Sequence, residues 1–324
     1  MNKMSYLFFH IMTFMLLAVF SFSASASARD PQDCQGCHTN PVYKKEDAEK
    51  LKECLTCHGT AGHPYRKVTS TLHPPPPNPP LRAKEENGRT SIKGGWEKDM
   101  ILIPEGEFIM GSDERLKDER PAYVVYLNSF YIDMFEVTDE DYKKFVESTG
   151  HPPPDNWENG NYPQGKGRHP VIFVDWNDAN AYCRWADKRL PRETEWERGA
   201  RGTDGRTYPW GDEWVTNKSN NPFGGHEDTM PVGSYEEGKS PYGLYDMSGN
   251  VWEWVDDYYF PHPGSEHVSP EFGTKYRLLK GGSWMNCMYY SCGISAPVYN
   301  RAFFDSTTKN SSLGFRCARD YEQN

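Results

Sequence analysis

The hydrophobic and polar positions divide the chain into three stretches. Residues 6–22 are almost wholly apolar, whereas residues 29–99 are polar and charged and have few apolar side chains. Residues 100–324 alternate short apolar runs with turn residues and contain most of the aromatic side chains. Because a short apolar run between turn residues is typical of a strand, the third stretch predicts a folded domain built from many short elements.

Several strands are expected in this third stretch. Two apolar runs at residues 100–104 and 108–111 predict a β-hairpin, and the aromatic-rich residues 123–135 predict further strands. From residue 202 onward, turn residues dominate. This part of the chain is therefore expected to contain much irregular structure.

Three helices are expected between these strands and the turn-rich region. Thr138 is followed by three acidic residues, which predicts an N-capped helix that ends at Gly150. A second helix is expected to begin at residue 177 or 178 and to reach about residue 188, and a third covers residues 193–199. Helices and strands together predict the α+β class.

The first 28 residues have the features of a secretory signal peptide. Lys3 supplies a positive charge, the apolar run follows, and Ala26-Ser27-Ala28 forms an A-x-A cleavage site before Arg29. The alternative is a membrane anchor, but the apolar run is short for a bilayer span and no later segment is long and apolar enough. We therefore expect cleavage after Ala28, a periplasmic or secreted protein, and no membrane insertion of the mature chain.

Four of the eight cysteines lie in two identical C-x-x-C-H motifs within 25 residues. Two thiols at this spacing can form thioethers to the two vinyl groups of one haem, and the adjacent histidine then faces the iron. The alternatives are a zinc site or redox dithiols, which do not need a histidine directly after the second cysteine. The sequence predicts two covalently bound c-type haems, held by Cys34, Cys37 and His38 and by Cys54, Cys57 and His58.

The second axial ligand of each haem iron is expected to be a histidine. Residues 29–99 contain no methionine, and their only histidines outside the two motifs are His63 and His73. Two irons and two spare histidines favour bis-histidine ligation, which usually gives a lower potential than His/Met ligation. Alternatively, one of the two is a surface residue, and an iron stays open or takes His151 or His169. The expected iron ligands are His38, His58, His63 and His73.

The haem-binding stretch is expected to be a small module. Its charged residues 44–52 predict a short helix, and the two macrocycles would form the core because few apolar side chains are present. Six prolines between residues 74 and 80 exclude a helix and predict an extended spacer, which polar residues continue. The expected division is a signal peptide (1–28), a di-haem module (29–73), a Pro-rich linker (74–97) and a large domain (98–324).

Charge is distributed unevenly between these parts. Residues 29–99 carry 12 basic and 10 acidic side chains, whereas residues 100–324 carry 23 basic and 36 acidic ones. An acidic body of this kind argues against a nucleic-acid partner. We expect redox proteins as partners, although charge alone does not identify them.

The large domain carries an ordered set of motifs. They are MGS at 110–112, PV at 170–171, VDW at 174–176, AYCRWA at 181–186, RLP at 189–191, YPWG at 208–211, GLYDMSGNVWEW at 243–254, GGSW at 281–284 and LGFR at 313–316. In number and order the set resembles the formylglycine-generating enzyme superfamily, over about residues 98–320. The resemblance implies an α+β, C-type-lectin-like fold with little regular secondary structure. Activity does not follow from the fold, so the site residues are compared separately.

Enzymes of this superfamily use two cysteines near the C-terminus to bind copper and to oxidise a substrate cysteine with O₂. The resemblance places this role on Cys287 and Cys292, which have the same spacing, and soft thiolates suit Cu(I). Three features differ from the enzymes. Cys287 lies one residue farther from Gly282, Met288 replaces the usual histidine, and residues 293–295 replace an arginine-rich stretch. The alternative is a structural disulfide or two buried thiols.

The resemblance implies two further sites. Cys183 and Cys317 match a pair that is disulfide-bonded in the exported family enzyme, and an oxidising compartment permits this bond. Family members also bind calcium in the loop that corresponds to residues 246–253, and oxygen ligands from an irregular loop suit Ca²⁺. The implied ligands are the side chains of Asp246 and Glu253 and the carbonyls of Gly249 and Val251. The alternative is that both carboxylates only accept hydrogen bonds from backbone amides.

Two functions from different classes follow. The favoured one is a non-enzymatic electron carrier, in which the haem module exchanges electrons and the large domain docks it to a partner or an assembly. The alternative is a copper- or thiol-dependent oxidoreductase, in which Cys287 and Cys292 oxidise a substrate and the haems supply or accept electrons. The carrier is favoured because both haem motifs are intact, whereas the cysteine pair departs from the family pattern.

Overall fold

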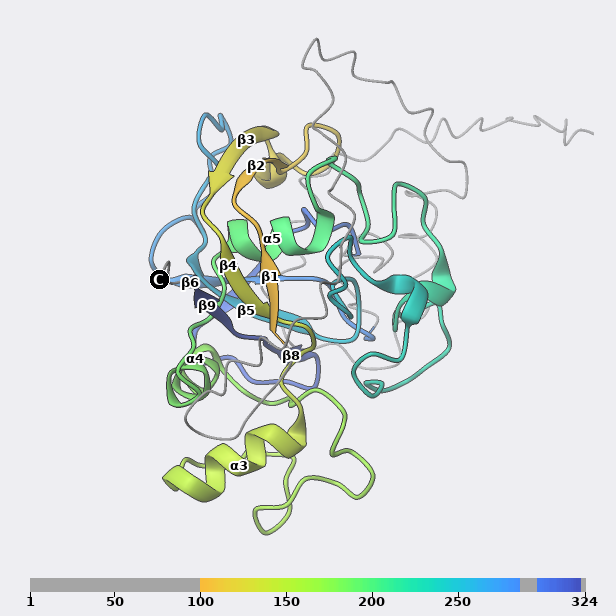
Figure 1. Cartoon of the computed structure of the whole chain (residues 1–324). Helices are drawn as coiled ribbons and strands as arrows, with labels where there is room; N and C mark the ends of the chain where they lie inside the picture. Colours follow the sequence, from red (N-terminus) through yellow and green to blue (C-terminus); the bar gives the residue numbers. More distant parts are fainter. Residues whose placement is uncertain (1–99, 286–295, 322–324) are drawn as a thin grey trace, which may run out of the picture.

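The computed structural model of the chain describes residues 100–285 and 296–321. The predicted signal peptide, haem module and linker lie outside the described residues, as do Cys287 and Cys292. The described part combines short strands, three short α-helices and long irregular connections (Figure 1). It therefore has the predicted α+β character.

The strands of the described part form three small sheets. One is antiparallel with the order β1-β4-β9, a second is the ribbon β2-β3, and the third has the order β7-β6-β5-β8, in which only β5 and β8 run parallel. Two of these strands lie within the predicted residues 123–135. The bounds are β1 (Met100–Ile103), β2 (Gly106–Met110), β3 (Tyr123–Leu127), β4 (Phe130–Asp133), β5 (Trp252–Tyr258), β6 (Tyr276–Lys280), β7 (Ala302–Asp305), β8 (Leu313–Gly314) and β9 (Ala318–Asp320).

The predicted hairpin between residues 100–104 and 108–111 is wrong. The first run pairs with β4 and the second with β3, so the two runs belong to different sheets. The chain between them is held by the guanidinium of Arg198, which lies in helix α5. This guanidinium donates hydrogen bonds of 2.9–3.1 Å to the carbonyls of Pro104, Gly106 and Glu107. A partner so distant in sequence leaves no mark on the local pattern, which explains the error.

Helix α3 (Asp139–Thr149) confirms the prediction made from Thr138 and Gly150. The Thr138 hydroxyl accepts a hydrogen bond of 3.2 Å from the Asp141 amide, which caps the N-terminus. Gly150 adopts a left-handed conformation with a φ of 72°, and its amide donates to the Val146 carbonyl. Both ends of this helix are therefore set by residues close to them in sequence.

The other two helices differ slightly from their predicted bounds. Helix α4 (Trp176–Trp185) begins earlier because the Asp175 carboxylate caps it by accepting a hydrogen bond from the Asp178 amide. It ends before the predicted residue 188, and Asp187 is left-handed with a φ of 57°. Helix α5 (Glu193–Arg201) continues two residues beyond the predicted end. Short 3₁₀ helices are η2 (Lys117–Glu119), η3 (Thr216–Lys218) and η4 (Glu236–Gly238).

Two apolar clusters fill the described domain. One joins helices α3 and α4 to β5 and is rich in aromatic rings such as Tyr142, Tyr182 and Phe315. The other packs α5 against the sheets through residues such as Trp196 and Leu278. Each buried ring removes a large area from water, so a polar chain still forms a core. No helix in the described part is long and apolar enough to cross a membrane.

Candidate functional site

Residues 246–253 form a tight loop that leads into strand β5. Asp246, Gly249 and Asn250 have positive φ angles of 59°, 99° and 63°. A Cβ atom at Gly249 would lie 2.3 Å from the carbonyl oxygen of Asn220, so only glycine fits there. The Asn250 amide donates a hydrogen bond of 2.8 Å to the same oxygen. Backbone contacts therefore define the path of this loop.

Three buried carboxylates and one guanidinium lie around this loop. They belong to Glu136, Asp246, Glu253 and Arg316, which we call the acidic cluster. Arg316 donates two hydrogen bonds of 2.7 Å to the two carboxylate oxygens of Glu253. The Trp196 indole donates a third, of 2.9 Å, to Glu253. This bidentate pair orients Glu253 and uses both of its oxygens.

The other two carboxylates of the acidic cluster accept hydrogen bonds from neutral donors. Glu136 accepts one of 2.6 Å from the Asn250 side chain and one of 3.2 Å from the Val251 amide. Asp246 accepts one of 2.8 Å from the Gly233 amide. These contacts satisfy polar atoms without supplying positive charge.

Within the four described residues of the acidic cluster, one guanidinium faces three carboxylates. Burial raises the pKa of Asp246 to about 6. Burial also raises the pKa of Glu136 well above its usual range, and the neighbouring Asp246 and Glu253 add to this effect. The surplus negative charge would be neutralised either by protons or by a bound cation.

The predicted calcium ligands Asp246, Gly249, Val251 and Glu253 all lie in this one loop. In the part of the chain that the structure describes, no three His, Cys, Asp or Glu side chains form a group that could hold a metal ion. A calcium ion here would therefore need the backbone carbonyls, and Glu253 would have to share an oxygen with Arg316. The alternative of bonding to amides alone fits Asp246 but not Glu253, whose partners are side chains. The calcium site stays a prediction.

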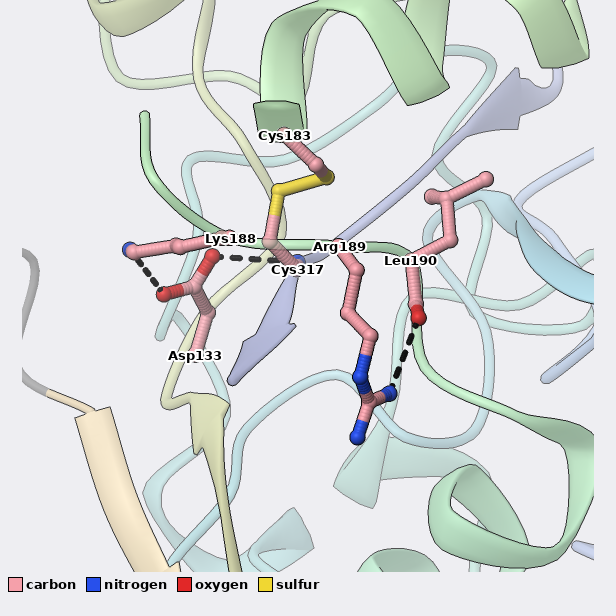
Figure 2. Close-up of a disulfide and its surroundings, with 6 residues drawn as sticks. All are labelled: Asp133, Cys183, Lys188, Arg189, Leu190 and Cys317. Carbon is pink, nitrogen blue, oxygen red and sulfur yellow. Dashed lines mark hydrogen bonds and ion pairs between the residues drawn. A yellow bond between two sulfur atoms is a disulfide. The ribbon is translucent and has the colours of Figure 1, made fainter. Parts of the chain in front are cut away.

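Cys183 of helix α4 and Cys317, just before β9, are joined by a disulfide across 134 residues of sequence (Figure 2). Both residues are fully buried. The Asp133 carboxylate lies beside the bond, accepts a hydrogen bond of 3.0 Å from the Cys317 amide and pairs with Lys188 at 2.6 Å. The disulfide therefore links α4 to the β1-β4-β9 sheet. It joins the two cysteines that the resemblance paired.

The segment 286–295, which carries the two cysteines of the predicted copper site, lies outside the described residues, but both of its flanks are placed. Before it, the Trp284 amide donates a hydrogen bond of 2.9 Å to the Asn250 carbonyl. After it, the Ser248 hydroxyl donates one of 2.7 Å to the Ala296 carbonyl. The segment therefore begins and ends beside the loop of the acidic cluster.

A second group of buried charges surrounds helix α5, and sequence reasoning missed it. We call this group the α5 network; its members are Glu193, Glu197, Arg201, Lys280 and Arg301. Arg301 donates hydrogen bonds of 2.7 and 3.0 Å to Glu193. Lys280 lies 3.0 Å from Glu197 and 3.7 Å from Glu193, and Arg201 lies 3.0 Å from Glu197. Glu193 and Glu197 therefore each lie within 4 Å of two cations.

The pKa values of both glutamates in the α5 network are lowered. Burial alone would raise them, but the neighbouring cations outweigh it, chiefly Arg301 for Glu193 and Lys280 for Glu197. Arg301 also donates to the carbonyls of Asp118 and Phe260, and so fixes the chain that leaves the segment 286–295. The four-residue spacing of the charged positions 193, 197 and 201 was the available signal of one polar helix face.

The residues predicted to bind haem lie outside the described residues: Cys34, Cys37, His38, Cys54, Cys57, His58, His63 and His73. The two alternative iron ligands lie within the large domain. His151 Nε2 is 2.8 Å from an Asp178 carboxylate oxygen, and His169 Nδ1 is 2.9 Å from the Thr229 hydroxyl. Both rings therefore have partners in their own domain.

The chain resembles known proteins over its large domain. A family model described as the sulfatase-modifying factor enzyme 1-like domain matches residues 89–321. The chain is 32% identical over 306 residues to the formylglycine-generating enzyme of Bos taurus, covering 74% of this chain and 80% of that protein. It is also 32% identical over 272 residues to inactive C-alpha-formylglycine-generating enzyme 2 of Mus musculus, covering 68% and 85%. The structure of PvdO from Pseudomonas aeruginosa matches with a TM-score of 0.54 and 30% identity, covering 68% and 94%.

Proposed function

Because the chain belongs to the family of the sulfatase-modifying factor enzyme 1-like domain, we propose that it joins such a domain to a di-haem c-type cytochrome and transfers electrons outside the cytoplasm. The observation that carries this proposal is the pair of C-x-x-C-H motifs within 25 residues. The large domain docks the haem module onto a redox protein or an assembly.

The cysteines and histidines of residues 29–73 have the chemistry that two c-type haems need. The four motif cysteines would form the thioethers, and the two motif histidines would each bind one iron. His63 and His73 would occupy the remaining axial positions. When bound, each haem supplies a one-electron redox couple. Two imidazoles on each iron leave no open position, which favours electron transfer over binding of a small substrate.

Two independent features support export. The first 28 residues have a charged start, an apolar run and an A-x-A site. The large domain contains the buried disulfide between Cys183 and Cys317, and such bonds persist in oxidising compartments. We therefore place the protein in the periplasm or outside the cell, where its partners are redox proteins and not nucleic acids.

A second candidate function is oxidation of a thiol substrate at Cys287 and Cys292. Its support is the five-residue spacing and the identity to the Bos taurus formylglycine-generating enzyme. The departures at Met288 and at residues 293–295 weigh against it. A relative named as inactive also occurs at the same identity, so membership of the family does not decide between the two functions.

Covalent haem attachment tests the electron-carrier proposal directly. The full chain is produced in a host with c-type haem maturation machinery, and its intact mass and reduced spectrum are recorded. We expect the added mass of two haems, of which the double variant Cys54→Ser/Cys57→Ser loses one and the control Cys287→Ser loses none. A mature protein without covalent haem would contradict the proposal. If the low-spin haem spectrum is unchanged in both His63→Ala and His73→Ala, these histidines are not the axial ligands.

The second candidate is tested on the same preparations. Copper uptake and oxidation of a cysteine-containing peptide are measured for the full chain and for Cys287→Ser. Turnover that disappears in the variant would make the chain an enzyme. Absence of both copper uptake and turnover would leave the electron carrier as the function.

A further inference from the structure

Three partly exposed rings form an aromatic surface, which we define as Tyr208, Trp210 and Trp214. The rings of Tyr208 and Trp210 are stacked, with centroids 5.4 Å apart and planes only 7° apart. The Trp214 ring is tilted by 56° and 49° against them, at centroid distances of 5.4 and 5.9 Å. The surface therefore presents two aromatic planes that meet at an angle.

This aromatic surface is not a part of the core. None of its rings belongs to either buried apolar cluster. The Trp210 indole N–H donates to the Glu213 carbonyl at 2.9 Å, whereas the Trp214 indole N–H has no hydrogen-bond partner among the described residues. Gathered, partly exposed rings with an available donor are typical of a binding surface.

Polyproline segments are suited to such a surface. In the polyproline II conformation the prolyl rings pack between aromatic side chains, and the backbone carbonyls, which have no internal partners, accept hydrogen bonds from donors such as an indole N–H. The chain contains one such segment, with six prolines between residues 74 and 80. We propose that this Pro-rich segment docks on the aromatic surface of its own large domain.

Chain length and charge both permit this docking. Twenty positions separate residue 80 from Met100, and an extended chain of that length spans about 65 Å. A domain of this size has a radius of gyration of roughly 17 Å, so most of its surface is within reach. Arg82 and Lys84 follow the prolines, and the exposed Asp212 and Glu213 lie next to the rings in sequence. The first two charged side chains after the prolines are therefore opposite in charge to those beside the rings, and Glu85 and Glu86 follow them.

The position of the aromatic surface gives the docking a consequence. The Val298 amide donates a hydrogen bond of 2.9 Å to the carbonyl of Thr207, the residue before Tyr208. The surface therefore adjoins the chain that leaves the segment 286–295. A docked spacer holds the end of the haem module beside that segment, which carries Cys287 and Cys292. This consequence rests on the proposed haem attachment, whereas the docking itself does not.

The first test compares the full chain with a full-length variant in which residues 74–80 are replaced by a Gly-Ser sequence of equal length. Tryptophan indole N–H signals are followed by NMR and assigned through Trp210→Phe and Trp214→Phe. We expect the signals of both residues to shift in the replaced-spacer variant, while that of the buried Trp157 stays in place. Unchanged Trp210 and Trp214 signals would overturn the proposal.

A peptide separates docking from other effects of the replacement. A synthetic peptide of residues 72–82, added to the replaced-spacer variant, should return both signals toward their wild-type positions. The same peptide with serine in place of each proline should have no effect. If both peptides act equally or neither acts, the Pro-rich segment is not the occupant.

The second test is limited digestion with trypsin after Arg82. Docking slows this cleavage, so Trp214→Ala should speed it at least threefold, whereas Phe223→Ala, which removes a 49% exposed ring outside the surface, should not. Equal rates in wild type and Trp214→Ala would contradict the docking. Protection that is lost on tenfold dilution would assign the docked segment to a second copy and would overturn docking within one chain.

Discussion

The acidic cluster and the α5 network both bury carboxylates, but the pKa values of Asp246 and Glu136 in the first move in the opposite direction to those of Glu193 and Glu197 in the second. In the acidic cluster, burial raises the pKa of Asp246 to about 6 and raises that of Glu136 well above its usual range. In the α5 network, the cations lower the pKa of Glu193 and Glu197 although burial opposes them. Burial is common to both regions, so the neighbouring charges decide whether its effect on the pKa prevails.

The number of cations within reach explains the difference. Glu193 and Glu197 each lie within 4 Å of two cations, whereas Asp246 and Glu136 share the guanidinium of Arg316 with Glu253, to which it is directly bonded. The carboxylates of the first region that have raised pKa values can therefore take up a proton more readily than Glu193 and Glu197, which are paired with cations. Both regions hold the flanks of the segment 286–295. Carboxylates with lowered pKa values and carboxylates with raised pKa values therefore lie near the same part of the fold.

The largest expected effect comes from breaking the α5 network. Arg301→Leu leaves the buried Glu193 without its main partner, and losing one partner of a buried pair costs about 3–5 kcal/mol. We expect this loss in the free energy of unfolding, measured by urea titration and circular dichroism. The control Arg206→Leu breaks a half-exposed pair with Asp204 and should cost less than about 1 kcal/mol. Similar losses in the two variants would refute the central role given to the network.

The backbone of the acidic cluster gives the next largest effect. Gly249→Ala combines a φ of 99° with a Cβ that would lie 2.3 Å from the Asn220 carbonyl oxygen, so we expect a loss of roughly 3 kcal/mol in unfolding free energy. The control Gly243→Ala has a φ of 87° but open space around its Cβ, and should cost about 1 kcal/mol. Equal costs at the two positions would show that the close approach to Asn220 is unimportant.

The acidic cluster should also make stability depend on pH and calcium. Because the pKa of Asp246 is raised in the folded state, its contribution to stability is complete below its usual pKa of 3.8 and is lost as the pH rises through about 6. We compare the unfolding free energies of wild type and Asp246→Asn in the presence of EDTA. The difference, wild type minus variant, should fall by roughly 2–3 kcal/mol between pH 4 and pH 7. Added Ca²⁺ should restore this difference in unfolding free energy at pH 7. A urea midpoint of wild-type unfolding that Ca²⁺ leaves unchanged at pH 7 would rule out the calcium site.

The smallest effect is expected at Glu136. The raised pKa of Glu136 means that removing its negative charge costs little. The hydrogen bonds from Asn250 and Val251 reach different oxygens of Glu136, so the single oxygen of a glutamine keeps one of them. Glu136→Gln should therefore lower the unfolding free energy at pH 7 by only about 1 kcal/mol. Glu193→Gln, which removes an ionised and paired carboxylate, should cost about 3 kcal/mol in the same measurement. A reversed order would invalidate the comparison of the two regions.

Part of the fold was predictable because its signals are local. Thr138 and Gly150 define helix α3 through contacts three or four residues away. The motifs of the large domain were enough to identify its family, which the match over residues 89–321 confirms. The hairpin error and the misplaced ends of α4 have the opposite cause. Arg198 bonds to carbonyls more than 90 residues earlier, and the cap of α4 is an aspartate that precedes the apolar pattern.

The sequence by itself determined the family of the large domain, the caps of its first long helix and the residues that predict two haems. Each of these depends on residue types at short or ordered spacing, which a single chain displays directly. Only the tertiary structure decided which buried carboxylates have a cation as their partner. The reason is that charge acts through space: Glu193 depends on Arg301, 108 residues later, and Glu253 on Arg316, 63 residues later. Folding alone brings these groups within hydrogen-bonding distance and sets how many cations each carboxylate meets.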